Sequence, residues 1–306
     1  MISLVGYTGF VGSNIYRKYE FDNVYNSKNI VEAYGTNPDI LVYAGVRAEK
    51  FLANKYPDED LKSINEAFNN IIKINPKKVI LISTIDVYPN PVNVTEFTNI
   101  NKCDLQPYGY NRLYLEELVI KNFKDYLIVR LPGLYGENLK KNFIYDLINI
   151  IPSMLTEQKY EELIHKDDYI NNYYIKLDNG FYKCIDLNKD EKNKLKKYFE
   201  NIGFSALNFT NSKASFQFYN LEYLWEHIQI AMKNNIKVLN IATEPVTTGE
   251  IFNIIYNKDF INNDVKLIPN YNYKTEYYRD FNGENGYLFD KKSILNDIKE
   301  FIKSKI

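Results

Sequence analysis

Short apolar runs alternate with amphipathic segments over the first 135 residues of the chain. Lys78–Ser83 is the clearest apolar run, and Asp60–Ile74 is a long amphipathic segment. This alternation is typical of repeated βαβ units and a parallel sheet. Right-handed crossovers then give an α/β fold with a doubly wound parallel sheet, whose binding crevice lies at the carboxyl ends of the strands. The predicted strands are Ile2–Val5, Asn23–Tyr25, Ile40–Ala44, Lys78–Ser83 and Tyr126–Leu131, and the predicted helices are Phe10–Tyr19, Asp60–Ile74 and Tyr110–Phe123.

The pattern changes after residue 135. Tyr173–Leu177 and Phe181–Leu187 flank Asp178-Asn179-Gly180, which is typical of a β-hairpin. Asp190–Ile202 is predicted to be a lysine-rich helix, with Gly203 as its C-cap. Strands are again predicted at Phe216–Tyr219 and Val238–Ala242, and helices at Leu221–Lys233 and Lys291–Ile306.

Composition excludes several classes of function. The net charge of −1, without a dense basic run, argues against nucleic-acid binding. No apolar run approaches the roughly 20 residues of a membrane span, so neither a membrane segment nor a signal peptide is predicted. Cys103 and Cys184 are expected to be free thiols, which favours a cytoplasmic protein. His165 and His227 are too few for a histidine-rich metal site, and His227 is interpreted as a helix-face or core histidine.

The first predicted strand leads directly into Gly6-Tyr7-Thr8-Gly9-Phe10-Val11-Gly12. Glycines without a Cβ atom let the backbone approach a pyrophosphate, and the following helix offers unpaired N–H groups. The position of this pattern, between a strand and a helix, favours a dinucleotide-binding turn.

Three further groups are expected at the same edge of the sheet. Thr84 follows the strand Lys78–Ser83, and Tyr108 and Arg112 are spaced to share one face of a helix. Arg130 ends the next strand ahead of a turn that contains Tyr135-Gly136.

Together these motifs resemble the extended short-chain dehydrogenase/reductases, also described as NAD-dependent epimerase/dehydratases. The motifs are the three glycines, Thr84 ahead of Val87-Tyr88, Tyr108-x-x-x-Arg112, and Arg130 with Tyr135-Gly136. Asn65 matches a helix asparagine that such enzymes use structurally or in a proton relay. The segment 240–251 resembles their late strand and following helix. The resemblance is good over about 1–136 and 216–255, and poor over 155–205.

The resemblance implies an enzyme with NADP or NAD as cofactor and a nucleotide-diphosphate sugar as substrate. It implies a dinucleotide-binding Rossmann domain, over 1–135 and 206–245, and a smaller α+β substrate-binding lobe, over 136–205 and 246–306. It also implies catalytic roles for Thr84, Tyr108 and Arg112. A homodimer through the helices 60–74 and 110–123 is a further implication. The residues implied in cofactor binding are Gly6, Thr8, Gly9, Phe10, Val11, Gly12, Asn26, Ser27, Ala44, Gly45, Tyr108, Arg112 and Pro132.

The residue types fit proton transfer next to hydride transfer. A tyrosine has a pKa of about 10, and a cation one helical turn away favours its phenolate. Tyr108 can then exchange a proton with a substrate hydroxyl while Thr84 bonds the same oxygen. The hydride itself belongs to the nicotinamide.

The chain departs from the family pattern at three places. Arg112 replaces the usual lysine, and arginine differs from lysine in both shape and titration. The position after Thr84 is Ile85, which cannot titrate, so a dehydratase mechanism is disfavoured; Asp86 is interpreted as a turn carboxylate that faces water. Asn26 and Ser27 stand where NAD enzymes often carry an acid, and Lys28 follows them, which favours NADP unless Lys28 is only a solvated loop residue.

We therefore predict an NAD(P)-dependent oxidoreductase, with a keto-sugar reductase ahead of a C4-epimerase that retains NAD. A non-catalytic cofactor sensor or scaffold is the competing hypothesis, because a fold alone does not establish activity.

Overall fold

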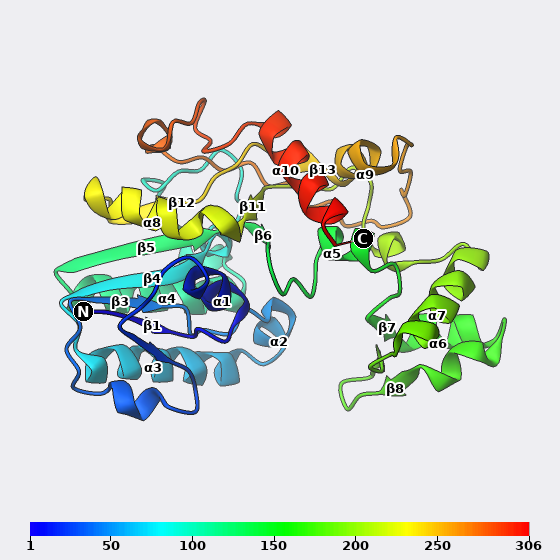
Figure 1. Cartoon of the computed structure of the whole chain (residues 1–306), viewed down its shortest axis with the longest axis horizontal. Helices are drawn as coiled ribbons and strands as arrows, with labels where there is room; N and C mark the ends of the chain where they lie inside the picture. The colour runs from blue at the N-terminus through cyan, green and yellow to red at the C-terminus, as the bar shows by residue number, and fades with distance from the viewer. Residues whose placement is uncertain (306) are drawn as a thin grey trace. The chain divides into compact units, whose positions relative to one another are not determined.

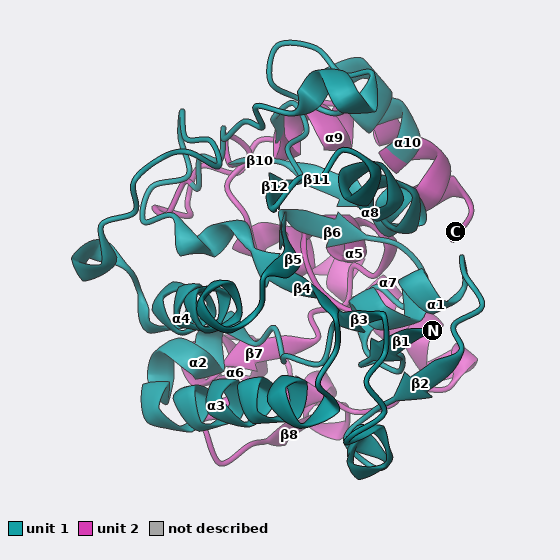
Figure 2. Ribbon diagram, turned by 90° about the vertical axis from the view of Figure 1, so that its left-hand side faces the viewer, with its two compact units in different colours: residues 1–139, 215–246, 269–297 teal, residues 140–214, 247–268, 298–306 magenta. Residues whose placement is uncertain are grey.

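The computed structural model describes residues 1–305, which form two compact units. Unit 1 comprises residues 1–139, 215–246 and 269–297, and unit 2 comprises residues 140–214, 247–268 and those from 298 onward (Figure 2). The division drawn from the sequence placed 206–214 with the main domain and 269–297 with the lobe, whereas the compact units assign these two segments the other way round.

Unit 1 is built on a six-stranded parallel sheet (Figure 1). Its strands, in spatial order, are β12 (Val238–Asn240), β5 (Asp125–Leu131), β4 (Lys78–Thr84), β3 (Ile40–Tyr43), β1 (Ile2–Val5) and β2 (Asn23–Tyr25). The chain reverses its direction of travel across the sheet after β2, so β1 and β3 flank the switch point at which such sheets bind ligands. The predicted doubly wound α/β fold is thereby confirmed.

Alternate strand residues face opposite sides of the sheet, because side chains along a strand alternate. Leu4 and Ile80 pack in a core with α1 (Phe10–Tyr16) and α8 (Leu224–Lys233). Their neighbours in sequence face the other side, where the core includes residues of α3 (Pro57–Ile74) and α4 (Pro107–Asn122). Helices therefore cover both faces of the sheet (Figure 1).

Shorter elements complete unit 1. They include α2 (Lys50–Lys55), the parallel pair β6 (Gly133–Tyr135) and β11 (Phe218–Asn220), β10 (Ser215–Phe216), and 3₁₀ turns such as Ile85–Val87 and Leu221–Tyr223. The short strand β13 (Val246–Thr247) lies where the chain passes from unit 1 to unit 2. The helix α10 (Lys291–Lys303) follows, so the predicted helix Lys291–Ile306 ends at Lys303, and its last residue lies outside the described part of the chain. Within residues 1–305 no helix is both long enough and apolar enough to cross a membrane.

Unit 2 has a three-stranded antiparallel sheet, in the order β7 (Met154–Thr156), β9 (Phe181–Cys184) and β8 (Tyr174–Lys176). The predicted hairpin is therefore confirmed, with Gly180 at a φ of +84° in its turn. Its core includes aromatic and aliphatic residues of α6 (Glu157–Ile164) and α7 (Lys189–Asn201). The other helices are α5 (Phe143–Ile148) and α9 (Thr248–Tyr256).

Helix α4 begins three residues earlier than predicted. Pro107 occupies its first turn, where the missing N–H of a proline has no intrahelical partner to lose. The earlier start places Tyr108 inside the helix, one turn ahead of Arg112. Helix α1, by contrast, ends at Tyr16 rather than at Tyr19.

Candidate functional site

The glycine turn after β1 is closed by contacts between backbone atoms. Gly6 has a φ of +92°, and its carbonyl oxygen accepts a hydrogen bond from the Gly9 N–H at 2.9 Å. A Cβ atom on Gly6 would lie 2.5 Å from the Ala44 carbonyl oxygen, and one on Gly12 would overlap with the Gly6 carbonyl oxygen. Glycine is therefore required at both positions, and the turn after β1 packs against the turn after β3. Such a cradle fits the close backbone approach that a dinucleotide pyrophosphate needs.

The other residues implied at this turn differ in exposure. Thr8 and Gly9 are exposed, whereas Phe10 and Val11 are half-buried and pack against the core on the α1 side of the sheet. Only the backbone and the Thr8 hydroxyl of this group are thus open to a ligand. Their role in cofactor binding stays a prediction.

The turns after β2 and β3 contain the next implied residues. The Asn26 side chain accepts a hydrogen bond from the Lys28 N–H at 2.8 Å, and Ser27 is exposed. Ala44 is half-buried and Gly45 is exposed. The sheet therefore places these residues on the same edge as the glycine turn, because the carboxyl ends of parallel strands share one edge.

Tyr108 lies at the start of α4 with its side chain buried, at 6% exposure. The Asn54 side chain of α2 accepts the Tyr108 backbone N–H at 2.9 Å, and the Tyr108 hydroxyl is hydrogen-bonded to Thr84. The next residue, Gly109, has no side chain, and this allows the Asp86 carbonyl to pack on the helix. The structure therefore brings together the predicted pair Thr84 and Tyr108.

Burial is the largest influence on the Tyr108 phenol and raises its pKa above the usual value. Arg112 opposes this rise, since a nearby positive charge favours the phenolate, and Asp86 adds to it. The cation that the sequence placed beside Tyr108 is therefore present, but burial outweighs its effect on the pKa.

Arg112 is buried, at 5% exposure, and its guanidinium stacks 4.0 Å from the centre of the Tyr108 ring. It forms an ion pair with Asp60 of α3 and donates to the Arg47 carbonyl at 2.6 Å. Asp60 also accepts a hydrogen bond from Asn111 at 2.8 Å. Arg112 thus joins the turn after β3 to α3 and α4, a structural role that the sequence did not indicate.

Asp86 does not simply face water, as the sequence had suggested. Its carboxylate lies 2.8 Å from the ammonium of Lys50 on α2 and accepts a hydrogen bond from the Tyr271 hydroxyl at 3.4 Å. Lys50 and Tyr271 were missed because they are distant in sequence and belong to no recognisable motif.

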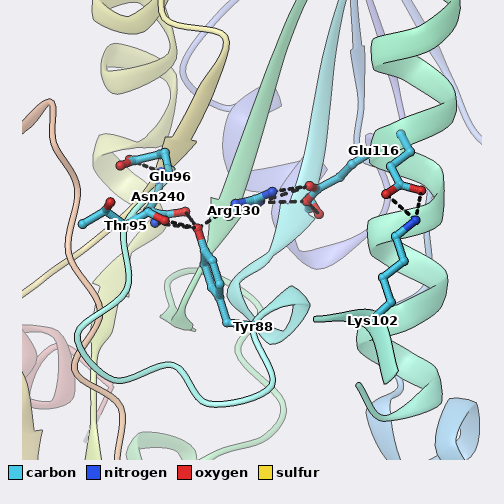
Figure 3. Close-up of polar contacts among 9 residues, drawn as sticks. Tyr88, Thr95, Glu96, Lys102, Glu116, Arg130 and Asn240 are labelled. Carbon is cyan, nitrogen blue, oxygen red and sulfur yellow. Dashed lines mark hydrogen bonds and ion pairs between the residues drawn. The ribbon is translucent and has the colours of Figure 1, made fainter. Parts of the chain in front are cut away.

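Arg130 is the centre of a buried polar network (Figure 3). Its guanidinium binds both oxygens of the Glu116 carboxylate on α4, and also donates to the Tyr88 hydroxyl at 2.7 Å. The Tyr88 hydroxyl also contacts the Asn240 side chain, 3.1 Å away. The network therefore ties the loop after β4 to β5, α4 and β12.

Two other residues implied by the resemblance follow β5. Pro132 is half-buried, and the Tyr135 hydroxyl donates a hydrogen bond to Asp297 at 2.8 Å. Asn65 is exposed on α3, so the structure does not place it in a relay. The buried asparagine of that helix is Asn70, which accepts from the Tyr34 hydroxyl at 2.7 Å.

Comparison with known proteins identifies the fold. No family model matches the chain, and no curated protein matches it in sequence. Solved structures do match it over nearly its whole length. A dTDP-4-dehydrorhamnose reductase from Bacillus anthracis, in complex with NADP, is 15% identical, with a TM-score of 0.64 over 99% of this chain and 97% of that one.

Two further solved structures also match the chain over nearly its whole length. A UDP-glucose 4-epimerase from Thermotoga maritima, with UDP-glucose, is 13% identical, with a TM-score of 0.61 over 99% of this chain and 97% of that one. MoeE5, in complex with UDP-glucose and NAD, is 13% identical, with a TM-score of 0.60 over 99% and 98% of the two chains. The chain has the fold of these nucleotide-sugar enzymes, as the sequence motifs predicted.

Proposed function

We propose that the protein is an NADP-dependent reductase that acts on the keto group of a nucleotide-diphosphate sugar. The observation that carries this proposal is the pairing of the Tyr108 and Thr84 hydroxyls at the end of β4, on the sheet edge that also holds the glycine cradle. The fold, which is shared with a reductase in complex with NADP, supports it.

The cofactor would be held by the turns after β1, β2 and β3, and when bound its nicotinamide supplies the hydride. Tyr108 donates the proton that the reduced oxygen needs, and Thr84 holds that oxygen by a hydrogen bond. Asn26 and Ser27, at the end of β2, leave the adenosine side without a carboxylate, which supports NADP over NAD. Unit 2 would supply the contacts that select the sugar.

The substitution Tyr108→Phe tests the proposal. It removes only the hydroxyl, so NADPH binding should persist while reduction of 4-keto nucleotide sugars falls by about a hundredfold or more. Binding is measured by fluorescence of NADPH and turnover by its absorbance. An unchanged turnover in Tyr108→Phe would show that Tyr108 is not the proton donor.

A C4-epimerase is the second candidate, supported by the fold shared with a UDP-glucose 4-epimerase. An epimerase of this kind would keep its NAD through purification, whereas a reductase would take up NADPH reversibly. Release of the cofactor from denatured protein, identified by its mass, separates the two. A protein that is stabilised by cofactor yet turns over no sugar would instead support the sensor or scaffold hypothesis.

We also propose a homodimer through α3 and α4. Ile72 on α3, and Tyr110 and Ile120 on α4, are each at least 40% exposed, as an apolar contact between copies requires. Light scattering should give twice the mass of 36.1 kDa, and a glutamate at Tyr110 should lower it. The free thiols Cys103 and Cys184 support a location in the reducing cytoplasm.

A further inference from the structure

Two charge pairs, rather than one, lie beside Tyr108. The first is Arg112 with Asp60, in which the guanidinium is buried and held by three partners. An arginine stays protonated in proteins, so its charge at this position is constant. Arg112 therefore favours the phenolate while it is itself bound to Asp60 and the Arg47 carbonyl.

The second pair comes from outside helix α4. Asp86 belongs to the 3₁₀ turn after Thr84, and its backbone carbonyl packs directly on Gly109, the residue after Tyr108. Its side chain is 21% exposed, whereas the side chain of its partner Lys50 is 48% exposed. Asp86 is therefore the more buried partner of the pair, and Lys50 is the more exposed one.

Lys50 has more than one contact in this arrangement. Its ammonium lies 2.8 Å from Asp86 and is also hydrogen-bonded to the Tyr271 hydroxyl. Burial lowers the pKa of Lys50, but Asp86 and Tyr271 together outweigh burial and raise it. The ammonium is therefore charged beside Asp86, on a side chain that water can reach.

We propose that the pair Lys50–Asp86 controls how readily Tyr108 releases and regains its proton, with Lys50 as a positioning residue that balances the Asp86 carboxylate. This inference rests on the proposed role of Tyr108 in proton transfer. Thr84, which is hydrogen-bonded to the Tyr108 hydroxyl, also accepts a hydrogen bond from the Asp86 N–H at 3.2 Å. The charged groups that influence the Tyr108 phenol are Arg112 from its own helix, Asp86 from the turn after β4, and Lys50 from α2. Among them, Asp86 disfavours the phenolate, while Lys50 and Arg112 favour it.

The balance of charges around Tyr108 predicts how the variants differ in their fraction of Tyr108 phenolate. Lys50→Met leaves the Asp86 carboxylate without its cation, so the pKa of Tyr108 should rise and its fraction of phenolate at a fixed pH should fall. Asp86→Asn removes the opposing charge and should raise that fraction. The double variant, with neither charge, should return close to the wild type.

Nuclear magnetic resonance can follow the phenol without any turnover. The protein is labelled with tyrosine carrying ¹³C at Cζ, and the Tyr108 signal is assigned by its absence in Tyr108→Phe. Its titration is recorded with and without NADP⁺ for the wild type, both single variants and the double variant. The pH dependence of NADPH-dependent reduction, in the same variants, should shift in the same directions.

Two controls separate this role from a structural one. Lys50→Arg keeps the charge and should titrate like the wild type. Lys102→Met breaks the ion pair of Lys102 with Glu117, in which the lysine side chain is also 48% exposed. This variant should leave the Tyr108 titration unchanged.

The inference is overturned if Lys50→Met and Lys102→Met give the same Tyr108 titration, or if Asp86→Asn fails to cancel the effect of Lys50→Met. The proposed function fails separately, if Tyr108→Phe retains the turnover of the wild type. Because the resonance titration needs no substrate, each failure can be recognised by itself.

Discussion

The helices of the two units begin in different ways. In unit 2, α5, α6, α7 and α9 each begin at a side chain that accepts a hydrogen bond from a backbone N–H of the first turn; these residues are Asn142, Thr156, Asn188 and Thr247. In unit 1, the starts of α1, α3, α4 and α8 have no such bond within residues 1–305. Helix α4 is held instead by Asn54, from another helix. Helix α10, which begins in unit 1, is an exception, because the Asp290 side chain accepts from the Ser293 N–H at 2.7 Å. Side-chain caps close in sequence thus begin these four helices of unit 2, whereas α4 also depends on a distant contact.

The ion pairs of the two units differ in burial. Unit 1 buries Arg130 with Glu116 and Arg112 with Asp60, and each pair joins different elements. The pairs of unit 2, such as Lys176 with Glu157, lie at the surface. A buried pair is costly to break, whereas a surface pair contributes little. The geometry around Tyr108 therefore depends on the integrity of all of unit 1.

Glu116→Gln should have the largest effect on stability. It removes one charge from a buried pair and leaves Arg130 uncompensated, which costs about 3–5 kcal/mol. Urea unfolding followed by circular dichroism measures the loss. The matched change in unit 2, Glu157→Gln, should leave the midpoint almost unchanged, and equal effects of the two substitutions would contradict the comparison.

Stability should also respond to pH through His227 in unit 1. This histidine is buried as predicted, with Nδ1 2.8 Å from the Tyr219 hydroxyl, and burial lowers its pKa to about 4. In the unfolded chain the pKa is about 6.5, so between these values the unfolded state binds the proton first. Acidification from pH 6.5 to 4 should therefore cost about 3 kcal/mol of unfolding free energy. His227→Gln should lose less stability over the same range.

Asp146 in unit 2 should have the opposite effect on the pH dependence of stability, which should fall as the pH rises. Burial raises the pKa of this carboxyl to about 7, so the folded state holds its proton where the unfolded state has released it. The contribution of Asp146 to the free energy of unfolding is fully present below the pKa that this carboxyl has in the unfolded chain. It is lost as the pH rises toward 7. Asp146→Asn should therefore flatten the decline of stability between pH 4 and 7, and a decline that stays as steep would contradict the assignment.

The elements that the sequence predicted well have local signals. The apolar run Lys78–Ser83 defines a buried strand, and Asp178-Asn179-Gly180 defines a hairpin turn, without reference to the rest of the fold. The glycine turn was also predictable, because its steric requirement follows from a tight strand-to-helix connection. Thr84 and Tyr108 met as expected because each lies beside a recognisable element.

The charges around Tyr108 could not be predicted in the same way. Lys50 and Asp86 are 36 residues apart, and Asp60 and Arg112 are 52 apart. No periodicity relates such positions, since their meeting depends on how α2 and α3 pack against α4. The role of Arg112 in catalysis and cofactor binding stays a prediction, but its contacts with Asp60 and the Arg47 carbonyl could not be foreseen from the sequence.

Gly12→Ala should lower the free energy of unfolding by less than Glu116→Gln does. The new methyl group would overlap with the Gly6 carbonyl oxygen, and such overpacking costs about 1–3 kcal/mol. If NADP is the cofactor, as proposed, it should raise the melting temperature of the wild type, and Gly12→Ala should abolish that rise. Gly9→Ala is the control in unit 1 for the loss of stability, because its new methyl group would lie 3.3 Å from the nearest atom, the Gly6 carbonyl oxygen. Gly180→Ala in unit 2 meets only backbone strain and should leave the cofactor effect intact.

Asn188→Ala should have the smallest effect, about 1 kcal/mol. The Asn188 side chain accepts hydrogen bonds from two N–H groups of α7, and the Glu191 carboxylate in return accepts one from the Asn188 N–H at 2.9 Å. Because glycine at this position costs only a few tenths of a kcal/mol, Asn188→Gly is the matched control. Thermal unfolding measures both. A loss of stability as great as that of Glu116→Gln would mean that α7 depends on distant contacts. It would contradict the view that the helices of unit 2 are defined by nearby residues.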